Sequence, residues 1–94
     1  MLDAVKLAMR PAIRTTAYDS DILDLIEAAK ADLEVAGILV DAGKPLIRRA
    51  IITYCRLNFG MPENPDLLKA SYDEQKAQLQ TATGYTEWGD DDGS

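Results

Sequence analysis

Apolar residues recur along most of the chain at the spacing of one helical face. One side of residues 1–10 carries a short amphipathic pattern, formed by Leu2, Val5, Lys6 and Met9. We predict a helix here that Pro11 ends, because the proline ring disfavours helical geometry in the residue before it. Residues 11–18 are then a connecting segment.

The clearest helix is predicted to begin at Asp19 or Ser20, whose side chains can accept a hydrogen bond from an otherwise unpaired backbone N–H. Asp21 and Asp24 place negative charge in its first turn, where the helix dipole favours it. Its apolar stripe has spacings of three and four residues and consists of Ile22, Leu25, Ile26, Ala29, Leu33 and Ala36. Gly37 is expected to end the helix in the left-handed conformation.

Two further helices are predicted, and each opens on a proline, whose missing N–H costs nothing at the first helical position. The third runs from Pro45 to Gly60. Its apolar face is broad and contains Leu46, Ile47, Ala50, Ile51, Tyr54 and Leu57, with Ile52 and Cys55 beside them. A helix apolar over so much of its circumference is expected to be central. The fourth runs from Pro65, capped by Asn64, to Gly84, and its narrower stripe is Leu68, Tyr72, Gln75 or Lys76, and Leu79.

These elements predict an all-α fold, a small bundle of about four helices with an acidic, flexible C-terminal tail. The apolar run at 38–40 has no partner strand and is interpreted as a packed connector. We place the helical domain at residues 1–84 and the tail at 85–94. The expected core residues are Ile22, Leu25, Ile26, Leu33, Ile47, Ile51, Tyr54 and Tyr72.

Charge separates the tail from the body. The 94 residues contain 16 acidic side chains, 10 basic ones and no histidine, for a net charge of −6. Residues 85–94 hold four of the acids and no base, so the body is close to neutral. Trp88 stands in this acidic segment without a local core, and three positions are open to it: exposed, anchored in a partner, or folded back onto the fourth helix.

Enzyme chemistry is not indicated. The lack of histidine excludes histidine-based acid–base catalysis and histidine metal sites, and Ser20, Ser71 and Cys55 have no such base to activate them. The glycines lack the spacing of a phosphate-binding loop. The aspartates that open the second helix lack the pattern of a calcium loop and are interpreted as helix-stabilising charges. We therefore expect no enzyme activity, no cofactor and no metal.

Cys55 is the only cysteine, so no intrachain disulfide forms, and its apolar surroundings predict a buried, inert thiol. No apolar run reaches the length of a membrane span, and the N-terminal residues do not have the pattern of a secretory signal. We expect a soluble, intracellular protein that does not bind membranes.

A small cationic group lies at the start of the third helix, where Lys44, Arg48 and Arg49 are close in sequence, and Arg10 and Arg14 precede the second helix. Our first interpretation is a solvated face, or a face that pairs with carboxylates of a neighbouring chain. The alternative is a DNA-binding helix, but a protein that neutralises many phosphates is expected to show a clearer basic stripe.

Four segments, LDAVKLAMR, DSDILDLIEAAKADLEVAGI, KPLIRRAIITYCRLNFG and PDLLKASYDEQKAQL, resemble the head–tail connector (adaptor) proteins of long-tailed bacteriophages. The resemblance covers roughly residues 2–80. The chain departs from it at Lys44, where such proteins often carry a helix-capping acid or small polar residue.

The resemblance implies a structural virion protein, made in the host cytoplasm and located at the head–tail junction. It would form a ring, a dodecamer in the virion, between the portal protein and a stopper or tail-completion protein, with double-stranded DNA passing non-specifically through the bore. Lys44, Arg48 and Arg49 would then lie at a subunit interface or in the bore. The tail residues expected to dock on the portal are Tyr85, Trp88, Asp90, Asp91 and Asp92. The alternative function is a small helical regulatory module that binds a partner protein.

Overall fold

A computed structural model describes residues 1–9, 12–41, 43–60, 62 and 64–81, and these contain helices and no strand. The helices are α1 (Leu2–Ala8), α2 (Asp19–Val35), α3 (Pro45–Asn58) and α4 (Pro65–Thr81). The predicted all-α class is confirmed. The tail at 85–94, and the predicted end of the last helix at Gly84, lie outside the described residues.

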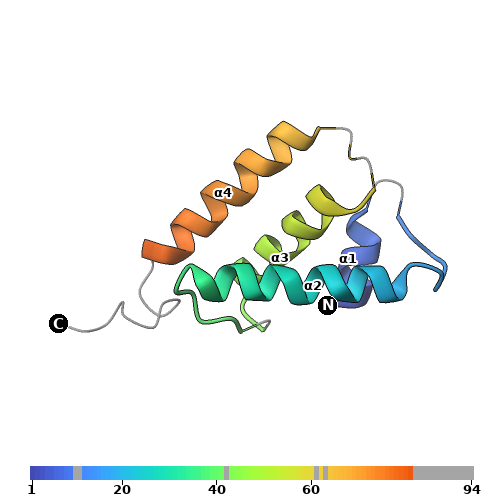
Figure 1. The fold of residues 1–94 in the computed structure, drawn as a ribbon, viewed down its shortest axis with the longest axis horizontal. Coiled ribbons are helices and arrows are strands. Elements are labelled where there is room, and N and C mark those ends of the chain that lie inside the picture. The colour runs from blue at the N-terminus through green and yellow to red at the C-terminus, as the bar shows by residue number, and fades with distance from the viewer. Residues whose placement is uncertain (10–11, 42, 61, 63, 82–94) are drawn as a thin grey trace.

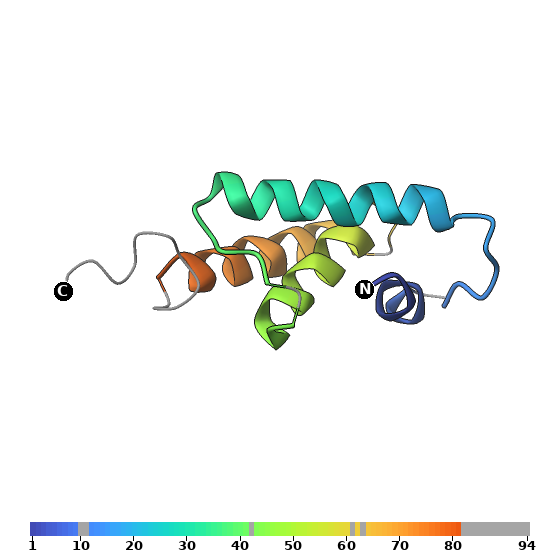
Figure 2. The ribbon, with the colours of Figure 1, turned by 90° about the horizontal axis from the view of Figure 1, so that it is seen from below.

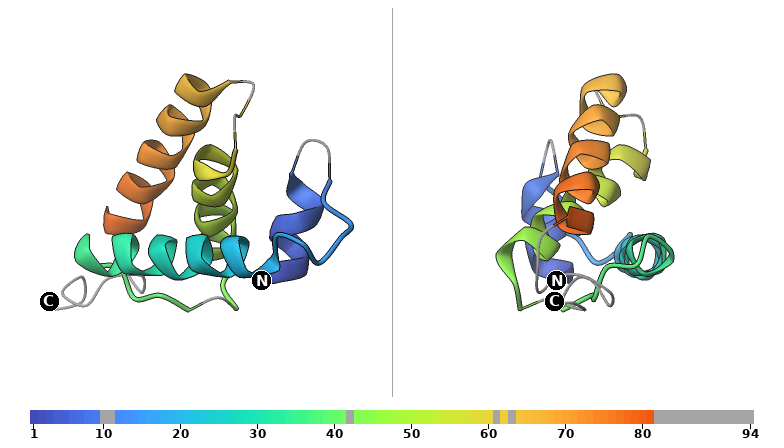
Figure 3. Two further views of the ribbon diagram at one scale, coloured as in Figure 1. Left: turned by 45° about the vertical axis from the view of Figure 1, so that its right-hand side comes forward. Right: turned by 90° about the vertical axis from the view of Figure 1, so that its left-hand side faces the viewer.

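Helix α3 lies at the centre of the fold, as its broad apolar face predicts. It packs against each of the other three helices, and Figures 1 and 3 show α1, α2 and α4 arranged around it. Its fully buried side chains are Ile47, Ala50, Ile51 and Cys55. Thr53 is also buried, and its hydroxyl donates a hydrogen bond of 2.9 Å to the Arg49 carbonyl, which satisfies that polar group inside the fold.

Leu46 corrects the predicted face of α3. It was expected to be buried, but its side chain is 39% exposed. Leu46 lies in the first turn of α3, where it lines a pocket between α3 and α4. Periodicity places Leu46 beside the buried residues of α3, but the pocket leaves its side chain partly exposed.

The buried stripe of α2 faces this central helix and consists of Ile22, Ile26, Ala29 and Leu33. Leu25 is only partly buried and packs at the edge of the core, and Tyr54 of α3 is placed in the same way. Helix α4 adds Tyr72 and Leu79, and the Tyr54 and Tyr72 rings meet edge to face with centroids 5.4 Å apart. The core therefore runs continuously from α2 through α3 to α4.

The end of α2 shows why a glycine follows it. Gly37 has a φ of 85°, in the left-handed region, as predicted. Its N–H donates to the Glu34 carbonyl at 2.9 Å, and the Ile38 N–H donates to the Leu33 carbonyl at 3.0 Å. Leu33 and Ile38 are both buried, so the turn has apolar side chains on either side of it and places Ile38 in the core.

The start of α2 differs from the prediction. Neither Asp19 nor Ser20 caps the helix, because Tyr18 occupies the cap position and makes no side-chain capping bond. The Asp19 carboxylate instead accepts a hydrogen bond of 2.8 Å from the Lys6 ammonium of α1. The Lys6 side chain is only 12% exposed, so its stem packs along α1 while its charge reaches Asp19. This ion pair joins α1 to α2.

Helices α1 and α4 pack on different sides of the centre. Val5 and Met9 bury the apolar side of α1 against the core, and α1 contacts both α2 and α3. Helix α4 contacts α3 and approaches α2 at its C-terminal end, as Figure 1 shows. Helix α1 is thus linked to α4 through α2 and α3.

Candidate interaction surface

The described residues hold no group of three or more histidine, cysteine, aspartate or glutamate side chains placed to bind a metal ion. Cys55 is buried, and burial raises the pKa of its thiol to about 12, which keeps it protonated and a poor nucleophile at neutral pH. Among the same residues, no helix has both the length and the apolar character needed to cross a membrane.

Three of the cationic residues noted in the sequence, Lys44, Arg48 and Arg49, lie at the start of α3, whereas Arg14 is exposed before α2 and Arg10 lies outside the described residues. Arg48 and Arg49 are exposed, while Lys44 is half-buried at the cap position, with its carbonyl accepting a 3.0 Å bond from the Arg48 N–H. Arg56 follows seven residues after Arg49 and so lies on the same face. We call Arg48, Arg49 and Arg56 the arginine ridge.

None of the three guanidinium groups of the arginine ridge forms an ion pair with the residues that the structure describes. Helix α3 contains no acidic residue at all. Arg56 was missed in the sequence, although its spacing of seven and eight residues from the two other arginines would have indicated it. The ridge is a positive strip without ion pairs to the described residues, on a chain with a net charge of −6.

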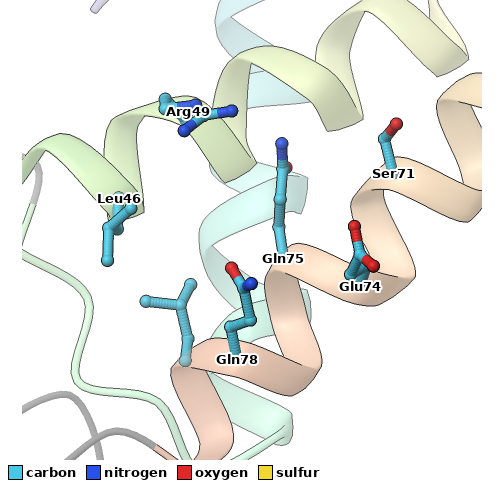
Figure 4. Close-up of a pocket in the computed structure, with 7 residues that line it drawn as sticks. Leu46, Arg49, Ser71, Glu74, Gln75 and Gln78 are labelled. Atoms are coloured by element: carbon cyan, nitrogen blue, oxygen red, sulfur yellow. The ribbon is translucent and has the colours of Figure 1, made fainter.

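A pocket of about 220 Å³ opens between α3 and α4 beside the ridge. Helix α3 contributes two lining residues and α4 the rest: Leu46, Arg49, Ser71, Glu74, Gln75, Gln78 and Leu79. Figure 4 shows Gln75 extending from α4 toward α3, with Arg49 on the opposite wall. Leu46 from the first turn of α3 and Leu79 from the last turns of α4 supply the apolar part of the pocket lining.

The Gln75 side-chain oxygen is buried and has no hydrogen-bond partner among the described residues. An unsatisfied buried acceptor costs about 1–3 kcal/mol. Its neighbours in the pocket offer a guanidinium, a second amide, a hydroxyl and a carboxylate. This combination of donors and acceptors suits a polar segment of a binding partner that brings its own N–H or O–H group.

A cluster of three side chains fixes α4 to α2, and we call it the Asp32 cluster. The Tyr72 hydroxyl donates a 2.5 Å bond to the Asp32 carboxylate, and the Lys76 ammonium donates one of 3.1 Å to the same oxygen. The Lys76 ammonium also lies 5.3 Å from the centre of the Tyr72 ring. These groups lie about forty residues apart in the sequence, so local patterns do not reveal the cluster.

Protonation states in the Asp32 cluster follow from its geometry. The hydrogen bond from Tyr72 lowers the pKa of Asp32, and Lys76 lowers it further, against the opposing effect of desolvation. Burial raises the pKa of Tyr72, and the neighbouring Asp32 carboxylate raises it further. Near neutral pH, Asp32 is therefore an anion and Tyr72 a neutral donor, which is the arrangement that the hydrogen bond requires.

A third contact extends this attachment. The Gln80 amide donates a 3.2 Å hydrogen bond to the Ala36 carbonyl at the end of α2. Tyr72, Lys76 and Gln80 are spaced four residues apart, so one face of α4 makes all of these bonds. The contacts hold the C-terminal half of α4 against α2.

A central apolar helix, a polar pocket and an unpaired arginine ridge are typical of a small helical protein that acts through contacts with other macromolecules. A comparison with known protein families shows which kind of protein this is. The chain belongs to the phage connector protein family, whose model matches residues 1–86 and so spans all four helices. No curated protein and no solved structure matched the chain significantly. Membership makes the chain a structural component of the virion that contacts other virion proteins.

Proposed function

We propose that the chain assembles into a ring adaptor between the portal vertex of the phage head and the next protein of the tail, a stopper or tail-completion protein. Double-stranded DNA passes through the bore of this ring. The observation that carries the proposal is the connector-family match over residues 1–86. The dodecameric state implied by the sequence resemblance is part of the proposal.

Exposed apolar side chains support assembly with further copies. The large ones among the described residues are Leu7, Tyr18, Leu23, Val35, Leu39, Leu46 and Leu67. Val35 is 87% exposed and Leu67 is 65% exposed. A chain this small buries a limited share of its surface by itself, so contacts between copies add stability. A head-to-tail contact repeated by rotation closes into a ring.

The charge of the described body fits a channel through which DNA slides. Binding that neutralises many phosphates depends on a dense array of lysine and arginine side chains. The only unpaired cationic strip that we find on the described helices is the arginine ridge, and α2 is acidic. We expect the free chain to cause no salt-dependent retardation of duplex DNA in a gel; retardation at low salt would favour a DNA-binding domain.

We further propose that residues 85–94 form a separate acidic segment that docks on the portal through Tyr85, Trp88 and Asp90–Asp92. The support is composition: aromatic side chains commonly dominate the energy of an interface, and an acidic segment orders on a basic partner. Deleting residues 85–94 is expected to leave the helical circular dichroism unchanged and to weaken binding to purified portal. Equal affinities of the truncated and full-length chains would contradict this docking.

Sedimentation velocity over a range of concentrations, with and without portal protein, tests the ring. We expect assembly that grows with concentration or forms on the portal, and a mass that is a fixed multiple of 10.3 kDa. A fixed dimer without affinity for portal would favour the alternative, a helical regulatory module. A monomer under all conditions, portal included, would contradict the ring.

A further inference from the structure

The outward face of α2 is strongly acidic. The helix contains six acidic residues and one lysine. Asp19 is paired with Lys6 and Asp32 with Lys76, which leaves four exposed acids: Asp21, Asp24, Glu27 and Glu34. Lys30 lies 3.3 Å from Glu27 and compensates one of them. The remaining three carry uncompensated negative charge at the surface.

Helix α3 carries the opposite charge, and its first turns lie on the other side of the molecule from α2 (Figure 2). On α3, Arg49 and Arg56 project away from the buried Ile47 and Ile51. Figure 2 shows α2 along one side of the molecule and the start of α3 on the other, and the right-hand view of Figure 3 shows the same separation. Because the buried stripe of α2 faces α3, the acidic face of α2 points away from α3 and from its arginine ridge within one chain.

The two faces also match in their apolar parts. Ala28, Ala31 and Val35 are exposed on the acidic face of α2, at spacings of three and four residues, and their small size permits close approach of another helix. On α3, Ile52 lies four residues from both Arg48 and Arg56 and is only partly buried. Each face thus has apolar side chains among its charged residues, and the charges are negative on α2 and positive on α3.

We propose that the acidic face of α2 in one copy docks on the arginine ridge of α3 in the next copy. This inference rests on the proposed ring and specifies which surfaces build it. Two acidic faces repel one another, as do two arginine ridges, so charge disfavours a two-fold dimer through either face. The pairing of unlike faces leaves one free face at each end, and addition of copies continues until the ring closes.

Charge reversal tests the pairing. A ridge variant, Arg48→Glu with Arg49→Glu, and a face variant, Asp24→Lys with Glu34→Lys, each place like charges at the contact. We expect each to raise the concentration needed for half assembly by about 10-fold or more, because juxtaposed like charges cost several kcal/mol. Combining all four substitutions restores attraction and the wild-type net charge, and we expect it to restore assembly.

Two controls separate this contact from net charge and from folding. Lys69→Glu changes an exposed charge on α4, outside both faces, and is expected to leave assembly unchanged. Circular dichroism of every variant should show the wild-type helix content. Each variant is compared with wild type by sedimentation velocity. Portal protein is added to every sample if the wild-type chain assembles only in its presence.

The outcomes distinguish the pairing from the ring itself. Loss of assembly in both the ridge variant and the face variant, with recovery in the combined variant, supports the pairing. If wild type, the ridge variant and the face variant all assemble equally well, the pairing is wrong but the proposed ring is not contradicted. If the combined variant stays dissociated, the pairing is also wrong. If wild type never assembles, the proposed function fails together with the pairing.

Discussion

Helices α3 and α4 are attached to the fold in different ways. Helix α3 is enclosed by the other three helices and buries apolar side chains along its length. Helix α4 buries only Tyr72 and Leu79, and it reaches α2 through the Asp32 cluster and Gln80. Apolar contacts hold α3 at any pH, whereas the α2–α4 contact depends on charge. The polar pocket lies between the apolar helix α3 and the polar contacts of α4.

Removing apolar volume from α3 is expected to have the largest effect. Ile51 is completely buried, so Ile51→Ala should lower the free energy of unfolding by about 2–5 kcal/mol, measured by urea denaturation. Leu46→Ala in the same helix is the matched control, because Leu46 is partly exposed and its loss should cost much less. A loss below about 1 kcal/mol for Ile51→Ala would mean that α3 is not the centre of the core.

Removing one hydroxyl tests the attachment of α4. Tyr72→Phe keeps the ring but deletes the donor to Asp32, and we expect a loss of about 1–2 kcal/mol in the free energy of unfolding. Tyr54→Phe is the matched control, since no hydrogen bond of the Tyr54 hydroxyl is found among the described residues. Equal losses in the two variants would show that the Asp32 cluster does not hold α4.

The pH dependence of the same attachment should be small but specific. Because the pKa of Asp32 is lowered in the folded chain, its contribution is complete above its ordinary pKa of 3.8 and declines as the pH falls through the lower folded value. We expect wild type to exceed Asp32→Asn in stability at pH 6, and the gap to narrow on acidification below about pH 4. A gap independent of pH down to pH 2 would contradict this role.

Sequence patterns predict the parts of the fold that depend on local spacing. The four helices, the glycine turn after α2 and the proline start of α3 all follow from residues close in the chain. Asp19 was taken for a helix cap because its neighbours permit that role, but Lys6, from a different helix, binds it instead. Local spacing does not show that a cation from a different helix will pair with a given carboxylate.

The candidate interaction surface was predictable only in part. Arg48 and Arg49 are adjacent in sequence and were identified, while Arg56 required the helical period to be followed for two turns. The pocket could not be foreseen, because its lining residues come from α3 and α4 and the packing of these two helices is not visible in local sequence patterns. The docking residues proposed for the tail remain a prediction.

Electron cryo-microscopy of the chain bound to its portal protein tests the central claim most directly. The account predicts a closed ring of identical copies around the portal channel, with the acidic face of α2 in each copy against the arginine ridge of its neighbour. Density for single copies scattered on the portal, or a portal vertex without the chain, would contradict it.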